Sequence, residues 1–378
     1  MRNLSTTDLR IEQLISRKWD IPPVKSRPAK GLLITGANSF LGVHVIHLLQ
    51  DKWPGPLHLL LRAPSPEKAN EKLIRAFAAW ELEYNNNRQT RVHVGDVTLR
   101  KAGLPAYEYH ELIKSTGFVL DLAANSLYRT PYLHYQRLWL PELERMITLC
   151  ADPQHPKSLH YPIPNLAGFF ITDKDFQQLG QDAWHSGYAG FKWVASKTIR
   201  NAFKQNLSGA IYDLPLVVGS VEKPGCPAHH PFWEMIAYFI KTGFFTDFLY
   251  KIVPVDLLAS VIVHNLLADI KGQASSFLHP ALTLPINRHS LEYLAAGILN
   301  LSYLSPERMY EVSPDKEMYH YLFPEGYYSL MQKVSDIPAK WPGQIELNSL
   351  PQTDMLFINT LNNLISSKKI NLTRIPGP

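Results

Sequence analysis

The feature that most constrains the fold of this 378-residue chain is the stretch 31–42, which reads Gly-Leu-Leu-Ile-Thr-Gly-Ala-Asn-Ser-Phe-Leu-Gly. A short apolar run turns at Gly36 and continues into residues 43–49, whose apolar side chains recur at helical spacing. This order predicts a strand, a tight loop and a helix, as at the beginning of a dinucleotide-binding unit. In such a unit the loop presents backbone N–H groups to a pyrophosphate, and Gly42 lets the helix pack closely on the strand.

Ser39 departs from the usual form of this loop, because it stands where the middle glycine is expected. Its Cβ would lie where the backbone approaches the phosphates. An ordinary buried strand followed by a glycine-rich turn would produce a similar pattern. The rest of the chain has to decide between the two interpretations.

Strand-like and helix-like segments alternate along the chain as far as residue 219. Repeated βα units of this length predict an α/β fold with a doubly wound parallel sheet of Rossmann type. Further strands are expected at 57–61, 91–94, 117–124 and 158–163, with 210–212 and 216–218 together as a sixth, and helices at 66–80, 107–114, 132–150 and 188–204.

Beyond residue 219 strand-like and helix-like segments no longer alternate, and this change predicts three regions. Residues 1–29 form a leader or linker, with a short amphipathic piece followed by a proline-rich connector. Residues 30–219 form the Rossmann domain. Residues 220–378 form a smaller, mainly helical substrate-binding region that returns a strand or two to the sheet.

Composition excludes several classes of function. The net charge of +5 comes without a dense basic cluster, so nucleic acid is not indicated. Cys150 and Cys226 offer neither a disulfide framework nor metal-ligand spacing. The adjacent pair 229–230, both histidine, indicates loop polarity and no metal site. The N-terminus is not a signal peptide, and the apolar stretch 252–270 is interrupted by charges, so we expect no membrane segment and a cytoplasmic protein.

Arg62 follows the second expected strand directly. A cation at that strand end can bind the adenosine 2′-phosphate, whereas a carboxylate would bind the ribose hydroxyl, so the sequence predicts NADP over NAD. Lys72, on the following helix, is a candidate second cation for the same phosphate. A solvated helix face explains Lys72 equally well.

Two further strand ends carry candidate cofactor contacts. Asp96, in Gly95-Asp96-Val97, fits a residue that bonds the adenine edge, and Val97 lies beside it. The small residues Ala123 and Ala124 would let the cofactor cross the sheet edge. Ordinary turn chemistry accounts for both as well.

Tyr188 and Lys192 form a Tyr-x-x-x-Lys pair at the start of an expected helix. One helical turn separates them, so both side chains share a face. An ammonium near a phenol lowers its pKa from about 10, which lets the tyrosine exchange a proton near neutral pH. The chain has 18 tyrosines, enough for about one such pair by chance. This pair is nevertheless the only one in the chain, and it opens the helix after the fifth expected strand.

The order of these features resembles the extended short-chain dehydrogenase/reductases. Within that family the chain is similar to the thioester reductase domains that end nonribosomal peptide synthetases and carboxylic acid reductases. The resemblance covers about residues 8–300. Beyond the nucleotide loop it is carried by residues 60–63, 131–132, 187–188 with 192–193, 252–256 and the leader residues 8–11.

The resemblance implies NADP(H) as cofactor and, as partner, an acyl- or peptidyl-carrier protein with a phosphopantetheine-bound substrate. Hydride attack on the thioester would release a thiol and an aldehyde, which is sometimes reduced further to an alcohol. Tyr188 and Lys192 are the implied catalytic residues: the phenol would protonate or stabilise the oxyanion, and the ammonium would support it and the nicotinamide ribose. The implied cofactor-binding residues are Thr35, Gly36, Asn38, Ser39, Phe40, Leu41, Arg62, Lys72, Asp96, Val97, Ala123, Ala124, Tyr188, Lys192 and Pro215.

Three further positions depart from the family's pattern. Where the family has Ser-Thr after the fifth strand, this chain has Ile163-Pro164, and Trp139 replaces an asparagine. Where the family has Arg-Pro-Gly after the sixth strand, residues 213–215 read Asp-Leu-Pro. Loss of one oxyanion donor typically lowers a rate about 10²–10³-fold.

These departures leave two alternatives to a reductase. One is a reductase-like domain without redox activity, which releases a carrier-bound chain by cyclisation with Tyr188 or His160 as the base. The other is a non-catalytic docking module on the same scaffold.

Overall fold

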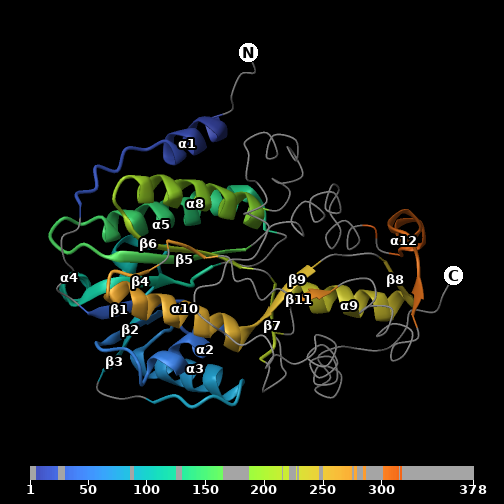
Figure 1. Cartoon of the computed structure of the whole chain (residues 1–378), viewed down its shortest axis with the longest axis horizontal. Coiled ribbons are helices and arrows are strands. Elements are labelled where there is room, and N and C mark those ends of the chain that lie inside the picture. Colours follow the sequence, from blue (N-terminus) through green and yellow to red (C-terminus); the bar gives the residue numbers. More distant parts are fainter. Residues whose placement is uncertain are drawn as a thin grey trace. The chain divides into compact units, whose positions relative to one another are not determined.

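The computed structural model describes residues 6–23, 30–85, 89–124, 130–164, 187–214, 216–220, 227, 230–246, 250–274, 276–278, 284–286, 301–314 and 316 (Figure 1). The chain divides into two units, Met1–Leu214 with Ala259–His279, and Pro215–Leu258 with Pro280–Pro378. The functional division into residues 1–29, 30–219 and 220–378 remains a prediction. None of the described helices combines the length and hydropathy needed to cross a membrane.

The first unit is built on a sheet with strand order β10-β6-β5-β4-β1-β2-β3, and every described pairing in it is parallel. Ile34 at the centre of the sheet pairs with Leu59 on one side and Leu120 on the other. The carboxyl ends of these strands meet at one edge. The strands are β1 (Gly31–Thr35), β2 (Leu57–Leu61), β3 (Thr90–Val94), β4 (Thr116–Asp121), β5 (Ser158–Pro164), β6 (Ser208–Leu214) and β10 (Phe277–Leu278).

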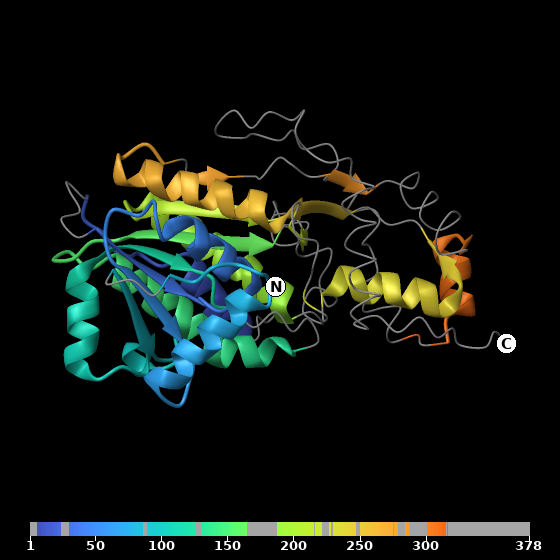
Figure 2. The same ribbon diagram turned by 90° about the horizontal axis from the view of Figure 1, so that it is seen from below.

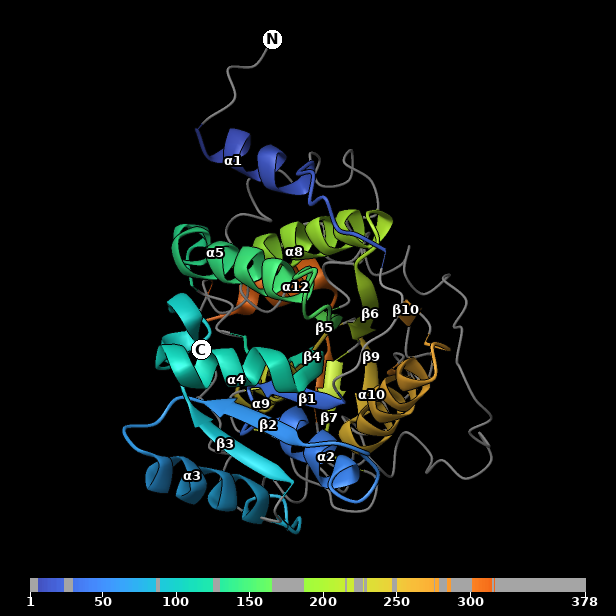
Figure 3. The same cartoon turned by 90° about the vertical axis from the view of Figure 1, so that its left-hand side faces the viewer.

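Helices cover both faces of this sheet. One face carries α2, α3 and residues 259–270 of α10, and the other carries α4, α5 and α8 (Figure 1, Figure 3). Figure 2 shows the first layer in front of the sheet, with α2 and α3 in blue and α10 in orange. The predicted doubly wound, Rossmann-type α/β fold is confirmed. The helices are α2 (Phe40–Leu49), α3 (Pro66–Ala78), α4 (Ala106–Ser115), α5 (Tyr132–Cys150), α8 (Gly187–Lys204) and α10 (Val255–Ile270), with a short segment η1 (Arg100–Gly103).

The core explains why these segments fold as they do. All residues of β1, β2 and β4 are buried, as continuous apolar runs require in a sheet covered on both faces. On the face of α5 and α8, Tyr135, Leu143 and Val194 are each completely buried within one cluster of apolar side chains. Burial of one such side chain contributes about 1.5–3 kcal/mol.

The leader is part of this core. Ile11 and Leu14 of α1 (Thr6–Ile15) are buried, and the helix packs on α8. Gln205, directly after α8, accepts from Trp19 N at 2.8 Å and donates to the carbonyl of Arg17 at 2.9 Å. The amphipathic piece expected in the leader is therefore a docked helix.

The second unit corrects one strand prediction. Residues 216–218 do not extend the sixth strand; they form β7 (Leu216–Val218), which pairs with β9 in a separate sheet. Pro215, which lies outside the described residues, lacks the N–H that a continuous ladder would need. β10 returns to the main sheet beside β6, as expected. The other elements here are α9 (Pro231–Thr242), β8 (Phe244–Phe245), β9 (Tyr250–Pro254), β11 (Leu284–Ile286), β12 (Ser302–Tyr303) and α12 (Pro306–Val312).

Candidate functional site

The loop between β1 and α2 has the geometry of a phosphate-binding turn. Gly36 adopts a φ of +62°, and a Cβ built there would lie 2.7 Å from the carbonyl carbon of Leu122, so only glycine fits. Ser39 is the N-cap of α2, and its Oγ accepts a hydrogen bond from Gly42 N at 3.1 Å. The serine that departs from the usual pattern therefore stabilises the start of the helix.

The first turn of α2 keeps backbone donors for an anion. A helix N-terminus leaves four N–H groups without acceptors inside the helix, and Ser39 Oγ satisfies one of them. No acceptor for Phe40 N or Leu41 N occurs among the described residues, and Asn38 lies half-buried in the same loop. Because these donors follow directly on the glycine turn, the loop fits the pyrophosphate of a dinucleotide cofactor.

Thr35 joins the carboxyl ends of β1 and β4. Its hydroxyl donates to Oδ1 of Asp121 and accepts from Ala123 N at 3.0 Å. Ala123 is half-buried, and Ala124 is exposed at the sheet edge. The small residues predicted for this edge therefore lie beside the phosphate-binding loop.

The structure brings the two predicted cations together. Lys72 Nζ donates to the backbone carbonyl of Arg62 at 3.2 Å. The Arg62 side chain is 74% exposed, with Nη1 3.8 Å from Oδ2 of Asp96. Asp96 also accepts from the backbone N and the hydroxyl of Thr98, at 2.9 and 2.7 Å. Val97 follows in the same turn, so the ends of β2 and β3 together present an exposed cationic pair next to a carboxylate.

Tyr188 and Lys192 both lie on α8, and both are buried. The Tyr188 ring is 8% exposed and its centroid is 6.3 Å from that of Tyr135 on α5. Lys192 is 2% exposed, and its Nζ donates to Tyr161 OH at 3.1 Å and to the carbonyl of Pro162 at 3.3 Å. The described partners of the ammonium are thus on β5.

The structure contradicts the expected effect of Lys192 on the pKa of Tyr188. Burial, and next the neighbouring Tyr135, raise the pKa of Tyr188. Burial also lowers the pKa of Lys192 to about 8, opposed first by Asp121 and then by Glu142. The expectation of a depressed tyrosine pKa was wrong, because removal from water dominates and the ammonium bonds to Tyr161.

Asp121 and Glu142, here called the carboxyl pair, were not predicted. Both are nearly inaccessible, at 1% and 2% exposure, and each influences the pKa of the other. Glu142 falls on the buried stripe of α5 with Trp139 and Met146. A charged residue at an apolar position of a helix was the signal available in the sequence.

The positions that depart from the family's pattern are apolar in the structure too. Ile163 is 1% exposed, and the Trp139 ring packs on Phe191 with centroids 6.3 Å apart. Ile163 cannot donate a hydrogen bond at the position of the family's hydroxyl, and the only donor in the Trp139 side chain is its indole N–H. Asp213 is buried at the end of β6, and Pro215 lies outside the described residues.

His160 is placed where it cannot act as a base. It is 0% exposed, Nε2 lies 2.9 Å from Oδ2 of Asp269, and Nδ1 lies 2.7 Å from Tyr212 OH. Ser158 donates to the same oxygen of Asp269, and Asn265 donates to Tyr212 at 3.4 Å. Both ring nitrogens therefore belong to a closed network between β5, β6 and α10.

His230, the described member of the histidine pair, is the N-cap of α9. Burial lowers the pKa of His230 to about 4, and residue 229 lies outside the described residues. In the part of the chain that the structure describes, no group of three or more histidine, cysteine or acidic residues could hold a metal ion.

Comparison with known proteins identifies the family. A sequence profile for NAD-binding domains, described as "Male sterility protein", matches residues 34–262. A linear gramicidin synthase of Brevibacillus parabrevis is 25% identical over 243 residues, which are 61% of this chain and 5% of that protein. The curated relatives that this chain matches are much longer proteins, and the match covers at most 22% of the length of any of them.

Solved structures share the fold. The terminal R domain from the myxalamid PKS-NRPS biosynthetic pathway superposes with a TM-score of 0.72 at 17% identity, covering 95% of this chain and 97% of that chain. A thiolation-reductase di-domain from an archaeal non-ribosomal peptide synthetase superposes with a TM-score of 0.65 at 12% identity, covering 98% and 99% of the two chains.

Proposed function

The chain belongs to the male sterility protein family, and from that premise we propose that it catalyses NADPH-dependent reductive release of a carrier-bound acyl or peptidyl thioester. One observation carries the proposal. The carboxyl edge of a single parallel sheet collects the glycine turn at Gly36, the cations Arg62 and Lys72, and the buried pair Tyr188 and Lys192. The product is an aldehyde or, after a second reduction, an alcohol.

The nucleotide would be held by the loop and by the cations. The N–H groups of Phe40 and Leu41 bind the pyrophosphate, and Arg62 with Lys72 binds the 2′-phosphate. The cofactor, when bound, supplies a hydride. The 74% exposure of Arg62 supports its role. Among the described residues, its guanidinium forms one long ion pair, with Asp96, so binding a phosphate would break no strong contact.

Tyr188 is suited to donate a proton in a reduction. Its raised pKa keeps the phenol protonated at neutral pH, so it can donate to the oxyanion that forms at the thioester carbonyl. Lys192, with a pKa of about 8, is still mainly an ammonium at neutral pH and stabilises the negative charge that develops. Ile163 supplies no donor where the family has a hydroxyl, so we expect slow turnover.

The partner that follows from this reaction is a carrier protein that presents its substrate on a phosphopantetheine arm. The superposition on a thiolation-reductase di-domain and the similarity to a gramicidin synthase support this choice.

Fluorescence titration with NADPH, and with NADH as a control, tests the cofactor. Arg62→Ala should weaken NADPH binding roughly ten- to hundredfold, because it removes a charge-assisted hydrogen bond, and should leave NADH binding unchanged. Arg75→Ala is the matched control, since its 81% exposed side chain lies on the following helix and pairs only with Glu71 among the described residues.

Equal binding of NADPH and NADH, unaffected by Arg62→Ala, would show that the NADP preference is wrong. Absence of binding at millimolar cofactor would overturn the reductase proposal. The alternatives are then cyclising release and docking. Because both ring nitrogens of His160 are already hydrogen-bonded, to Tyr212 of β6 and Asp269 of α10, Tyr188 is the remaining candidate base for cyclisation.

A further inference from the structure

We propose that the carboxyl pair, Asp121 and Glu142, holds one proton between its two side chains and positions the Lys192 ammonium as a charged group. The inference rests on the proposed function, which gives Lys192 its task. Neither carboxyl is placed to touch the substrate, so both are positioning residues.

Three elements of the first unit bring these side chains together. Asp121 ends β4, Glu142 lies on α5 and Lys192 lies on α8, and α5 packs directly on α8. None of the three is more than 2% exposed. Asp121 is held from the other side by the Thr35 hydroxyl, while Lys192 is held by Tyr161. The cluster is therefore held from both sides and is almost completely removed from bulk water.

Charge balance requires one proton on the pair. Two ionised carboxylates beside a single buried ammonium would leave one negative charge uncompensated, which is costly away from water. The other cation in reach, Arg145, is half-buried and donates Nη2 to the carbonyl of Thr98 at 2.7 Å. The other groups that face the cluster, Tyr161 and Tyr188, are phenols that burial keeps neutral.

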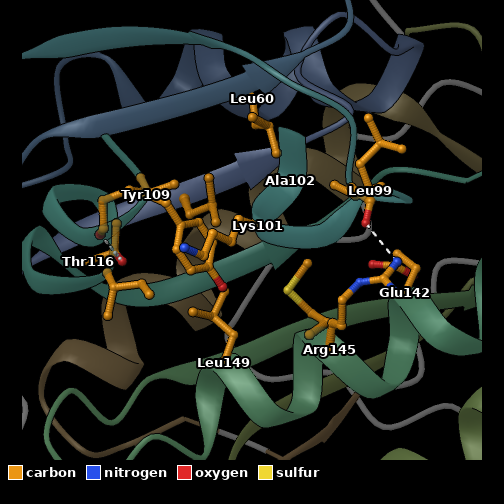
Figure 4. Close-up of a pocket in the computed structure, with 14 residues that line it drawn as sticks. Leu60, Leu99, Lys101, Ala102, Tyr109, Thr116, Glu142, Arg145 and Leu149 are labelled. Atoms are coloured by element: carbon orange, nitrogen blue, oxygen red, sulfur yellow. Dashed lines mark hydrogen bonds between the residues drawn. The ribbon is translucent and has the colours of Figure 1, made fainter. Parts of the chain in front are cut away.

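The surroundings place this proton on Glu142. Apart from the other carboxyl of the pair, its oxygen Oε1 has no hydrogen-bond partner among the described residues. The side chain lines a cavity of about 40 Å³ whose other walls include Leu60 and Met146. Figure 4 shows Glu142 and Arg145 on the same helix at one side of this cavity. Asp121, in contrast, has the Thr35 hydroxyl and the Lys192 charge to favour its ionised form.

The directions of the pKa shifts agree with this assignment. Burial, and next the charge of Asp121, raise the pKa of Glu142 well above its usual value. The pKa of Asp121 is also raised by burial, but Thr35 and Lys192 oppose that rise. The pair therefore carries one negative charge, on Asp121, which matches the single positive charge of Lys192.

Urea unfolding as a function of pH tests the proton without any cofactor. Above pH 4.5, the usual pKa of a glutamate, Glu142 is ionised in the unfolded chain but protonated in the folded protein, so folding takes up a proton. The free energy of unfolding should therefore fall as the pH rises from 4.5 toward the pKa of Glu142 in the folded protein. Above pH 5, the unfolding equilibrium constant of the wild-type chain should rise with pH relative to that of Glu142→Gln, by up to about tenfold per pH unit, until the folded-state pKa is reached. Gln replaces the neutral acid with a neutral donor and removes the titration.

The matched control is Glu144→Gln on the same helix, because Glu144 is 39% exposed and pairs with Arg17. It should keep the wild-type pH dependence. If Glu142→Gln also keeps it, Glu142 is ionised in the folded protein and the proposal is overturned. This outcome is independent of whether the protein binds NADPH.

The pH profile of NADPH-dependent thioester reduction tests the effect on Lys192. Asp121→Asn removes the charge that favours the ammonium, so the alkaline limit of the profile should move down by at least one pH unit. Glu142→Gln should leave that limit in place. Equal shifts in both variants, or none in either, would overturn the positioning role, whereas no activity in the wild-type chain would count against the proposed function alone.

Discussion

Strand β5 separates two buried polar networks, one on each face of the sheet, that differ in how completely they are satisfied. His160 points toward α10, where Asp269 and Tyr212 occupy both its ring nitrogens. The next residue, Tyr161, points to the opposite face, where it accepts from Lys192. On the Lys192 side, Asp121 Oδ2 and Glu142 Oε1 have no hydrogen-bond partner among the described residues outside the carboxyl pair itself. No side-chain oxygen or nitrogen of the His160 network lacks a partner in this way.

This difference indicates the role of each network. A network with all its hydrogen bonds made is rigid and has no capacity to bind or exchange a proton, so the His160 network holds the sheet to α10. A network with open positions carries a cost in stability that a functional site can justify. The contacts of His160, Ser158 and Asp269 thus indicate a structural role, whereas Lys192 beside two carboxyls is the centre that we propose to be functional.

Tyr188→Phe should have the largest effect on activity and little effect on stability. Loss of the proton donor should slow thioester-dependent NADPH oxidation roughly 10²–10⁴-fold. Tyr135→Phe is the control, because this ring meets the Tyr188 ring edge-on but lies deeper in the core at 0% exposure. Equal loss in both variants would mean that packing, and not proton donation, explains the effect.

Asp269→Ala should have the opposite effect: it should lower the stability of the fold and leave the rate of thioester reduction nearly unchanged. It leaves His160 and Ser158 buried without their acceptor, so the free energy of unfolding should fall by about 3 kcal/mol in urea titrations. The rate measured on folded protein should stay within about twofold. Glu111→Ala, which breaks an exposed pair with Lys114, should cost less than about 1 kcal/mol. A large rate loss in Asp269→Ala would mean that the His160 network contributes to the chemistry and is not purely structural.

The pH dependence of turnover gives the smallest and most specific contrast. Lys192 has a pKa of about 8, so the rate should hold below pH 8 and fall about tenfold per pH unit above it as the ammonium loses its proton. Lys192→Arg, if active, should hold its rate to higher pH, since a guanidinium stays charged. Asp269→Ala should retain the wild-type profile, because it changes only the opposite face.

The central fold could be predicted because its signals are local. Residues 57–61 are leucine at every position but His58, and they become β2 with the bounds expected. The loop after β1 was predictable for the same reason, since a glycine turn and a helix start follow each other in sequence. The assignment of 216–218 to the main sheet failed because a short apolar strand does not reveal which sheet it will join.

The site was only partly predictable, because its electrostatics depend on contacts between distant segments. The spacing of Tyr188 and Lys192 correctly placed both on one helix, but the partner of the ammonium is on β5, 31 residues away from it in sequence. The carboxyl pair joins residues 121 and 142 across two elements. Only after the fold is known does burial decide that Lys192 holds its proton weakly and that Glu142 keeps one.

The alternation along β5 makes this strand far more sensitive to a change of length than to a change of side chain. A substitution at His160 or Tyr161 disturbs one network and leaves the other in place. Insertion or deletion of one residue ahead of them would turn each side chain to the opposite face and set a histidine against Lys192 and a phenol against Asp269. We therefore expect random mutagenesis to recover folded proteins with substitutions in β5, and none with its length altered by one.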